Sequence, residues 1–168
     1  DNGVPRTLPS FTSAITGNTI NFAFNPFEEN NVVKLDSANV GPKTLTLSSP
    51  APQSQIAIVL SGGSLAPATE FAVVPYTINY VGGQMESGTV NVPDWGAAPA
   101  ALTPTTEDLF NASRTTANVT TWPVTSDNNT TAGRWSINVT EITPTNPNAS
   151  VASITFGQPT LNNGNPLN

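Results

Sequence analysis

Residues 71–95 read FAVVPYTINYVGGQMESGTVNVPDW and carry the strongest structural signal in this chain. Val, Ile, Thr, Tyr and Phe favour strands, and Gly82 and Gly83 supply the positive φ that a tight turn between two strands requires. After this turn, apolar and polar residues alternate, so Val90 and Val92 are expected on one face of the second strand. The segment therefore predicts an antiparallel hairpin, against which the rest of the chain packs.

Short apolar or alternating segments, separated by Pro, Gly, Asn and Ser, follow the same pattern elsewhere in the chain. The further strands expected from this pattern are residues 19–24, 32–35, 44–47, 55–60, 135–140 and 152–156. Residues 55–60 are nearly all apolar, which predicts a central strand buried on both faces. Pro50 is expected to end the strand at 44–47, because proline lacks the backbone donor of a sheet ladder.

Three segments differ from this pattern. Residues 1–17 are expected to form an extended N-terminal segment, and residues 157–168 an irregular C-terminal tail. Residues 107–114 predict a helical turn with Thr106 as its N-cap, because two acidic residues in a first turn suit the helix dipole. Many short strands with hardly any helix predict one all-β domain over 1–168, an antiparallel β-sandwich of the jelly-roll type.

Composition excludes several classes of function. The chain has 168 residues, a net charge of -6, five Lys plus Arg, and neither Cys nor His. Disulfides, thiol nucleophiles, Cys-type zinc sites and His-based triads are therefore excluded. Nucleic acid is not expected as a partner, because binding its phosphates requires clustered cations. Membrane insertion is not expected either, because no apolar run approaches the roughly 20 residues of a membrane span.

The sequence favours a secreted or extracellular location, because Lys is scarce while Thr and Asn are abundant. Asn-x-Ser/Thr sequons, the acceptor motif for N-glycosylation, begin at Asn111, Asn118, Asn128, Asn129, Asn138 and Asn148. Their clustering predicts a glycosylated surface on the C-terminal half. The alternative is coincidence, because a chain rich in Asn and Thr matches this motif by chance.

Two tryptophans are the candidate ligand-binding residues. Pro93 stops the second strand of the hairpin and leaves Asp94 and Trp95 at its end, where the indole could stack on a sugar ring and the carboxylate could bind its hydroxyls. The alternative is that Trp95 caps the sandwich and Asp94 bonds its own turn. Trp122 lies in a polar loop together with Asp127, which suits a ligand platform, although the ring could equally pack beneath its own loop.

Carboxylates in turns are candidate ligands for a structural calcium ion, which binds six to eight oxygens. The candidates are Glu28, Glu29 and Asp36, and the alternative for each is a solvated turn residue. Nothing in the sequence brings two carboxylates together as a glycosidase requires, and Ser61 lacks the Gly-x-Ser-x-Gly context of a hydrolase nucleophile. The chain is therefore expected to be non-catalytic.

Four segments carry a resemblance to a known family. They are the apolar strand 56–60, the strand 76–80, the Val-Pro-Asp-Trp stop at 92–95 and the closing Val-Ala-Ser-Ile-Thr-Phe at 151–156. In these segments the chain resembles the galactose-binding-like jelly rolls, which are accessory modules of secreted carbohydrate-active enzymes. The resemblance implies a non-catalytic sugar-binding or structural domain, often with bound calcium.

Two functional hypotheses follow. The first is an extracellular module that binds a glycan or polysaccharide through loops that carry Trp122 and Trp95. The second is a structural subunit of an extracellular fibre or surface layer. Such a subunit would self-associate by lending residues 4–16 to the sheet edge of a neighbour.

Overall fold

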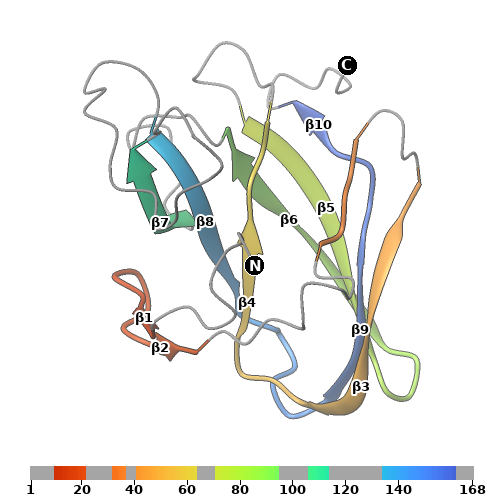
Figure 1. Ribbon diagram of the computed structural model, residues 1–168. Coiled ribbons are helices and arrows are strands. Elements are labelled where there is room, and N and C mark those ends of the chain that lie inside the picture. Colours follow the sequence, from red (N-terminus) through yellow and green to blue (C-terminus); the bar gives the residue numbers. More distant parts are fainter. Residues whose placement is uncertain are drawn as a thin grey trace.

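The computed structural model describes residues 10–21, 32–36, 41–63, 71–94, 106–113 and 134–161, and all regular secondary structure in these ranges is β-strand. Figure 1 shows a larger and a smaller sheet packed face to face, with a small hairpin beside the smaller one. Every pairing between named strands is antiparallel. The predicted all-β sandwich is therefore confirmed, and the jelly-roll connectivity stays a prediction.

The larger sheet is built around the expected hairpin. Its strands are β3 (Lys43–Pro52), β5 (Phe71–Tyr80), β6 (Met85–Pro93), β9 (Ser150–Phe156) and β10 (Thr160–Leu161). β5 pairs with β6, and Val74 lies opposite Val90. Gly82 and Gly83 take φ values of 102° and 87° in the connecting turn. The hairpin, its glycine turn and its end at Pro93 are all confirmed.

The other edge of β5 is shared by two strands in succession. β9 pairs with the second half of β5, β10 pairs with its first half, and β3 lies beyond β9. Between β9 and β10, the Gly157 N–H donates to the Pro75 carbonyl at 2.8 Å. The expectation that 157–168 is irregular is therefore wrong for Thr160 and Leu161, because β5 offers them ladder partners.

The smaller sheet has the order β4 (Ile56–Leu60), β8 (Arg134–Ile142) and β7 (Thr106–Ser113). The expected central position of residues 55–60 is wrong. β4 pairs with β8 on one side, forms no ladder with another named strand, and its residues are half-buried. The buried middle strand is β8, where the three residues 138–140 are buried on both faces.

β7 replaces the helical turn that the sequence predicts at 107–114, so this prediction is wrong. Thr106 pairs with Thr140 and Ser113 pairs with Arg134, with a register shift after Asp108. The acidic residues of a first helical turn are a local signal worth a fraction of a kcal/mol. The ladder to β8 satisfies the backbone groups that face β8 from Thr106 to Ser113, apart from the register shift, so tertiary pairing outweighs the local preference.

Two further strand predictions are wrong, one in its end and one altogether. β3 runs through Pro50 to Pro52, with a register shift between Thr46 and Ala51. Proline is tolerated there because β3 pairs with β9 on one side only, and an edge strand needs fewer ladder donors. Residues 32–35 form no strand, although Leu35 packs against the core.

The small hairpin is formed by β1 (Phe11–Thr12) and β2 (Thr19–Ile20). The predicted strand 19–24 is therefore short, and residues 22–24 lie outside the described ranges. The hydroxyl of Thr16 donates to the Glu141 carboxylate at 2.9 Å, which joins this hairpin to β8.

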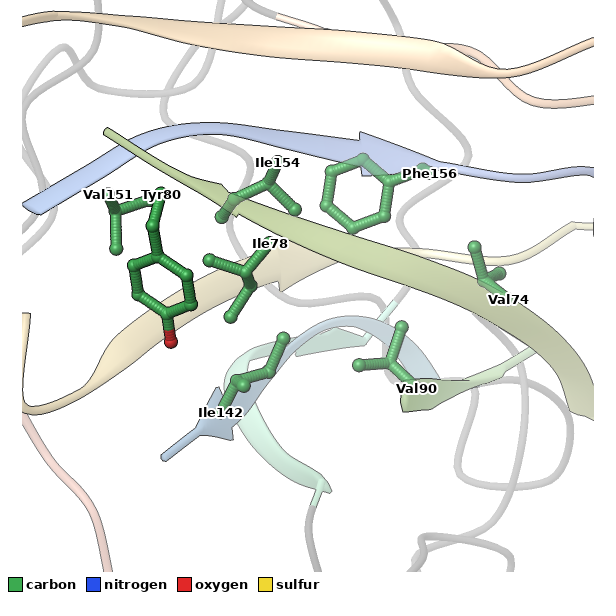
Figure 2. Packing of buried hydrophobic residues seen from close by; sticks show 8 residues of the cluster. All are labelled: Val74, Ile78, Tyr80, Val90, Ile142, Val151, Ile154 and Phe156. Atoms are coloured by element: carbon green, nitrogen blue, oxygen red, sulfur yellow. The ribbon is translucent and has the colours of Figure 1, made fainter. Parts of the chain in front are cut away.

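Apolar side chains from both sheets form the core shown in Figure 2: Val74, Ile78, Tyr80, Val90, Ile142, Val151, Ile154 and Phe156. Only Ile142 of this set comes from the smaller sheet. Ile56 and Ile58 of β4 are half-buried and pack against the cluster. Ile78 and Val151 are completely buried. Since the chain has no Cys, burial of this surface is the main stabilising term, at roughly 1.5–3 kcal/mol per fully buried large side chain.

Candidate functional site

Asp94, a predicted ligand-binding residue, lies where the two sheets meet at one end of the sandwich. The Gly62 N–H donates to the Pro93 carbonyl at 3.1 Å, and Gly62 and Asp94 form an isolated parallel bridge. The continuation of β4 is thereby joined to the end of β6. Asp94 is 9% exposed, so this residue is largely enclosed by the junction.

The other predicted ligand-binding residues, Trp95, Trp122 and Asp127, lie outside the described ranges. Their position relative to Asp94 therefore stays a prediction. Both interpretations of each tryptophan, a ligand platform or a packing residue, stay predictions.

At the opposite end of the sandwich, Glu86 holds a loop in place. Glu86 lies opposite Ile78 in β6, so its side chain starts on the face that carries the core. One carboxylate oxygen, Oε2, accepts a hydrogen bond from the Thr145 backbone N–H at 2.9 Å and a second from the Thr145 hydroxyl. The Asn146 side chain also donates to Gln84 at 3.4 Å. These contacts fasten the connection between β8 and β9 to the turn of the hairpin.

This polar cluster changes the acidity of its members. Desolvation acts to raise the pKa of Glu86, but the hydrogen bonds from Thr145 outweigh it and hold the pKa below its ordinary value of 4.5. Burial is the main cause of the raised pKa values of Tyr76 and Tyr80, and the nearby Glu86 carboxylate raises both further. The Tyr80 hydroxyl is buried and has no partner in hydrogen-bonding geometry among the described residues, although Glu86 is near enough to affect its acidity.

The outer face of the larger sheet carries aligned, uncharged polar side chains, which we call the hydroxyl face. Its members are Thr44, Thr46, Thr77, Asn79, Ser87, Ser153 and Thr155. Strand register places Ser87, Thr77, Thr155 and Thr44 in one row across four strands. The next row contains Met85, Asn79, Ser153 and Thr46. Neither row contains a charged side chain.

Hydrogen bonds within the hydroxyl face fix its side chains. Thr77 and Ser87 are joined through their hydroxyls at 3.1 Å, and Thr44 and Thr155 at 3.0 Å. The Asn79 amide donates to Ser153 at 3.0 Å and to Thr155 at 3.3 Å. A surface with fixed hydroxyl and amide groups offers both donors and acceptors to a neutral polar ligand. The alternation of Thr44 and Thr46 with Leu45 and Leu47 indicates such a face, but only the register shows which polar residues adjoin.

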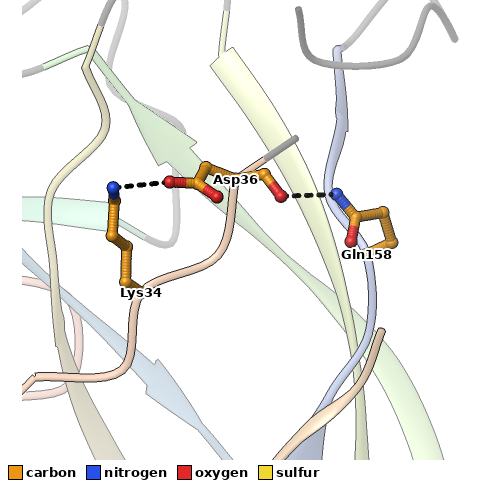
Figure 3. Close-up of polar contacts among 3 residues, drawn as sticks. All are labelled: Lys34, Asp36 and Gln158. Atoms are coloured by element: carbon orange, nitrogen blue, oxygen red, sulfur yellow. Dashed lines mark hydrogen bonds and ion pairs between the residues drawn. The ribbon is translucent and has the colours of Figure 1, made fainter. Parts of the chain in front are cut away.

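Asp36, a predicted calcium ligand, is paired with a lysine. Its carboxylate lies 2.6 Å from Lys34 Nζ, and its backbone carbonyl accepts from the Gln158 side chain at 3.2 Å (Figure 3). Glu28 and Glu29 lie outside the described ranges. No group of three or more acidic, His or Cys side chains in the described residues could hold a metal ion. A structural calcium ion stays a hypothesis.

The two sequon asparagines whose side chains the structure describes differ in their exposure to solvent. Asn138 is completely buried in β8 and does not fit as a glycosylated residue, since an attached glycan must reach solvent. Asn148 is exposed in a turn. The side chain of Asn111 and the whole of Asn118, Asn128 and Asn129 lie outside what the structure describes.

The chain was compared with protein-family models, with curated proteins and with solved structures, and no match was found in any of them. The likeness to galactose-binding-like modules therefore stays a hypothesis. Among the described residues there is no helix long and apolar enough to cross a membrane.

Proposed function

We propose that this chain is a non-catalytic extracellular module that binds a neutral glycan or polysaccharide. The supporting observation is the hydroxyl face, whose fixed hydroxyls and amide match the uncharged hydroxyl groups of sugars. The net charge of -6 with only five Lys plus Arg disfavours anionic glycans. The ligand class is therefore a neutral sugar chain, and the galactose-binding-like jelly roll is the fold family that we propose for it.

Aromatic stacking at the Asp94 end is the second part of the proposal. Trp95 directly follows the enclosed Asp94, and sugar rings stack on indole faces. Trp122 and Asp127 are assigned to the same role by their polar surroundings in the sequence. In this proposal the tryptophans supply affinity, and the hydroxyl face supplies a second contact surface.

Absence of catalysis is proposed on two grounds. The chain has no Cys or His, the side chains most often used at neutral pH for nucleophilic or acid–base steps. Two described carboxylates have structural partners: Glu86 binds Thr145, and Asp36 pairs with Lys34.

A calorimetric titration with soluble neutral polysaccharides of several linkages tests this function. Binding is expected for at least one of them, and no binding across the panel would overturn the proposal.

Trp95→Ala and Trp122→Ala test the end loops. Thr77→Lys tests the hydroxyl face, and Thr12→Lys, on the exposed side of the small hairpin, is its control. The variant that loses affinity locates the contact surface.

A structural subunit of a fibre or surface layer is the second candidate function. Two strands of the larger sheet, β3 and β6, form a ladder with one named strand each, which leaves their outer edges as candidates for pairing with another copy. Phe11 and Thr12 already pair with β2, so lending residues 4–16 would first open this hairpin. Light scattering at increasing concentration tests this candidate: concentration-dependent growth supports it, and a monomer throughout contradicts it.

A further inference from the structure

Two sequons that stand ten residues apart have opposite surroundings. Asn138 in β8 is completely buried, and Thr140, the hydroxyl residue of its sequon, is 2% exposed. Asn148, by contrast, is exposed in the connection between β8 and β9, and its sequon ends at Ser150, the first residue of β9. The folded protein can carry a glycan only on an asparagine whose side chain reaches solvent, because the attached sugar is bulky and hydrated. Only the second sequon offers an accessible asparagine.

The turn that carries Asn148 is anchored on both sides. On its N-terminal side, Thr145 is bound by Glu86, and the Asn146 carbonyl accepts from the Ala149 N–H at 3.1 Å. On its C-terminal side, the Ser150 carbonyl accepts from the Val81 N–H at 2.8 Å. The asparagine therefore projects from a short turn whose backbone is hydrogen-bonded to the hairpin, and a glycan there displaces none of these contacts.

We propose that Asn148 is an N-glycosylation site of the folded protein and that Asn138 is not. In this reaction the amide nitrogen Nδ2 of Asn148 bonds to the anomeric carbon of an oligosaccharide carried on a lipid pyrophosphate. The bond from that carbon to the pyrophosphate oxygen breaks, the lipid pyrophosphate leaves, and the amide loses one proton. No oxidant or reductant is consumed.

The position of Asn148 also determines what the glycan leaves open. β6 runs from Met85, beside the Asn148 turn, to Pro93, beside Asp94, so the two sites lie at opposite ends of the sandwich (Figure 1). The eight steps from Met85 to Pro93 span roughly 26 Å at about 3.3 Å per residue. The glycan on Asn148 is therefore attached at the end of the sandwich remote from Asp94. This inference does not rest on the proposed glycan-binding function.

The test is secretion of the full chain from a eukaryotic host that performs N-glycosylation. The soluble, folded fraction is digested and its glycopeptides are mapped by mass spectrometry, with enzymatic deglycosylation in heavy-oxygen water to mark each occupied asparagine. Glycan is expected on Asn148 and not on Asn138. An unmodified Asn148, or a glycan on Asn138 in the folded fraction, would overturn the proposal.

Matched variants at Ser150 make the assignment specific. Ser150→Thr keeps the hydroxyl and is expected to retain the glycan, whereas Ser150→Ala removes the hydroxyl and is expected to abolish it. Both variants are also purified from a host without glycosylation and compared by thermal unfolding, so that a folding defect is recognised. Equal glycan occupancy of Asn148 in the alanine and threonine variants would contradict the assignment.

Discussion

Tyr76 lies directly opposite Gly88 across β5 and β6, and its ring covers the glycine backbone. A Cβ atom added to Gly88 would meet the Tyr76 hydroxyl oxygen at 2.5 Å and the ring carbon that bears it at 2.6 Å. Glycine ordinarily weakens a strand, because it has no side chain to pack. Here the aromatic side chain of the neighbouring strand occupies that space.

We therefore expect Gly88→Ala to destabilise the protein. The Tyr76 ring would have to move, at an expected cost of about 1–2 kcal/mol in unfolding free energy measured with urea. In a Tyr76→Ala background the same substitution should cost much less, because the obstacle is gone. Equal costs in the two backgrounds would contradict the packing described.

Glu86 predicts a specific pH dependence. Its pKa is lowered in the folded state, so its contribution to stability is present above the ordinary value of 4.5 and is lost as pH falls through the lower folded value. We expect Glu86→Gln to be less stable than the native chain by about 1 kcal/mol at neutral pH. The difference should shrink as the pH falls below the ordinary value of 4.5, in urea titrations from pH 7 into the acid range.

The raised pKa values of Tyr76 and Tyr80 place their titration in alkali, outside this window. Thr145→Val is the matched control, because it keeps the backbone donor and removes only the hydroxyl bond to Glu86. It should cost less than Glu86→Gln at neutral pH. A stability difference for Glu86→Gln that does not change with pH would refute the role assigned to its charge.

Asn138 predicts a stabilising substitution. Its side chain is completely buried, and neither its nitrogen nor its oxygen has a hydrogen-bond partner among the described residues. Asn138→Leu keeps the number and branching of the side-chain heavy atoms and removes the unsatisfied amide. The unfolding free energy should rise by about 1 kcal/mol, because the gain from removing the amide exceeds the cost of fitting the bulkier methyl groups. Asn148→Leu, at an exposed turn, should change it by no more than about 0.5 kcal/mol. A loss of stability in Asn138→Leu would indicate that the amide has a partner, such as a buried water molecule.

Asp36 contacts both Lys34 and Gln158, and we expect loss of the Gln158 side chain to lower the unfolding free energy more than loss of the Lys34 side chain. Lys34 and Asp36 form an ion pair at 2.6 Å, but the Lys34 side chain is 74% exposed, so Lys34→Ala should cost less than about 0.5 kcal/mol. Gln158 donates to the Asp36 carbonyl and accepts from the Gly41 N–H at 3.3 Å, which ties two segments to the connection between β9 and β10. Gln158→Ala should cost about 1–2 kcal/mol. Urea unfolding of the two variants side by side checks this order.

Sequence alone was a good guide to strands but not to their partners. The hairpin is local, so alternation, the Gly82–Gly83 turn and Pro93 were enough to predict it. The helical turn at 107–114 was a wrong prediction, because the strand β7 depends on pairing with β8, and every partner lies more than twenty residues later in the chain. Residues 55–60 are apolar without being central, because Ile56 and Ile58 contribute to the core from an edge strand.

The candidate sites likewise could be predicted from the sequence only in part. Asp94 and the sequons can be read from the sequence, but the burial of Asn138 and the exposure of Asn148 cannot, since the two motifs are chemically equivalent. The hydroxyl face is likewise spread over four strands, and its rows exist only in the paired register.

The amino-acid sequence by itself determined that this chain is an all-β protein without thiol or imidazole chemistry, because strand periodicity, turn residues and composition are local properties. Tertiary structure alone decided which strands adjoin, which carboxylates are held by neighbours and which sequon is accessible. Pairing and burial depend on residues far apart in the chain, so no local pattern specifies them.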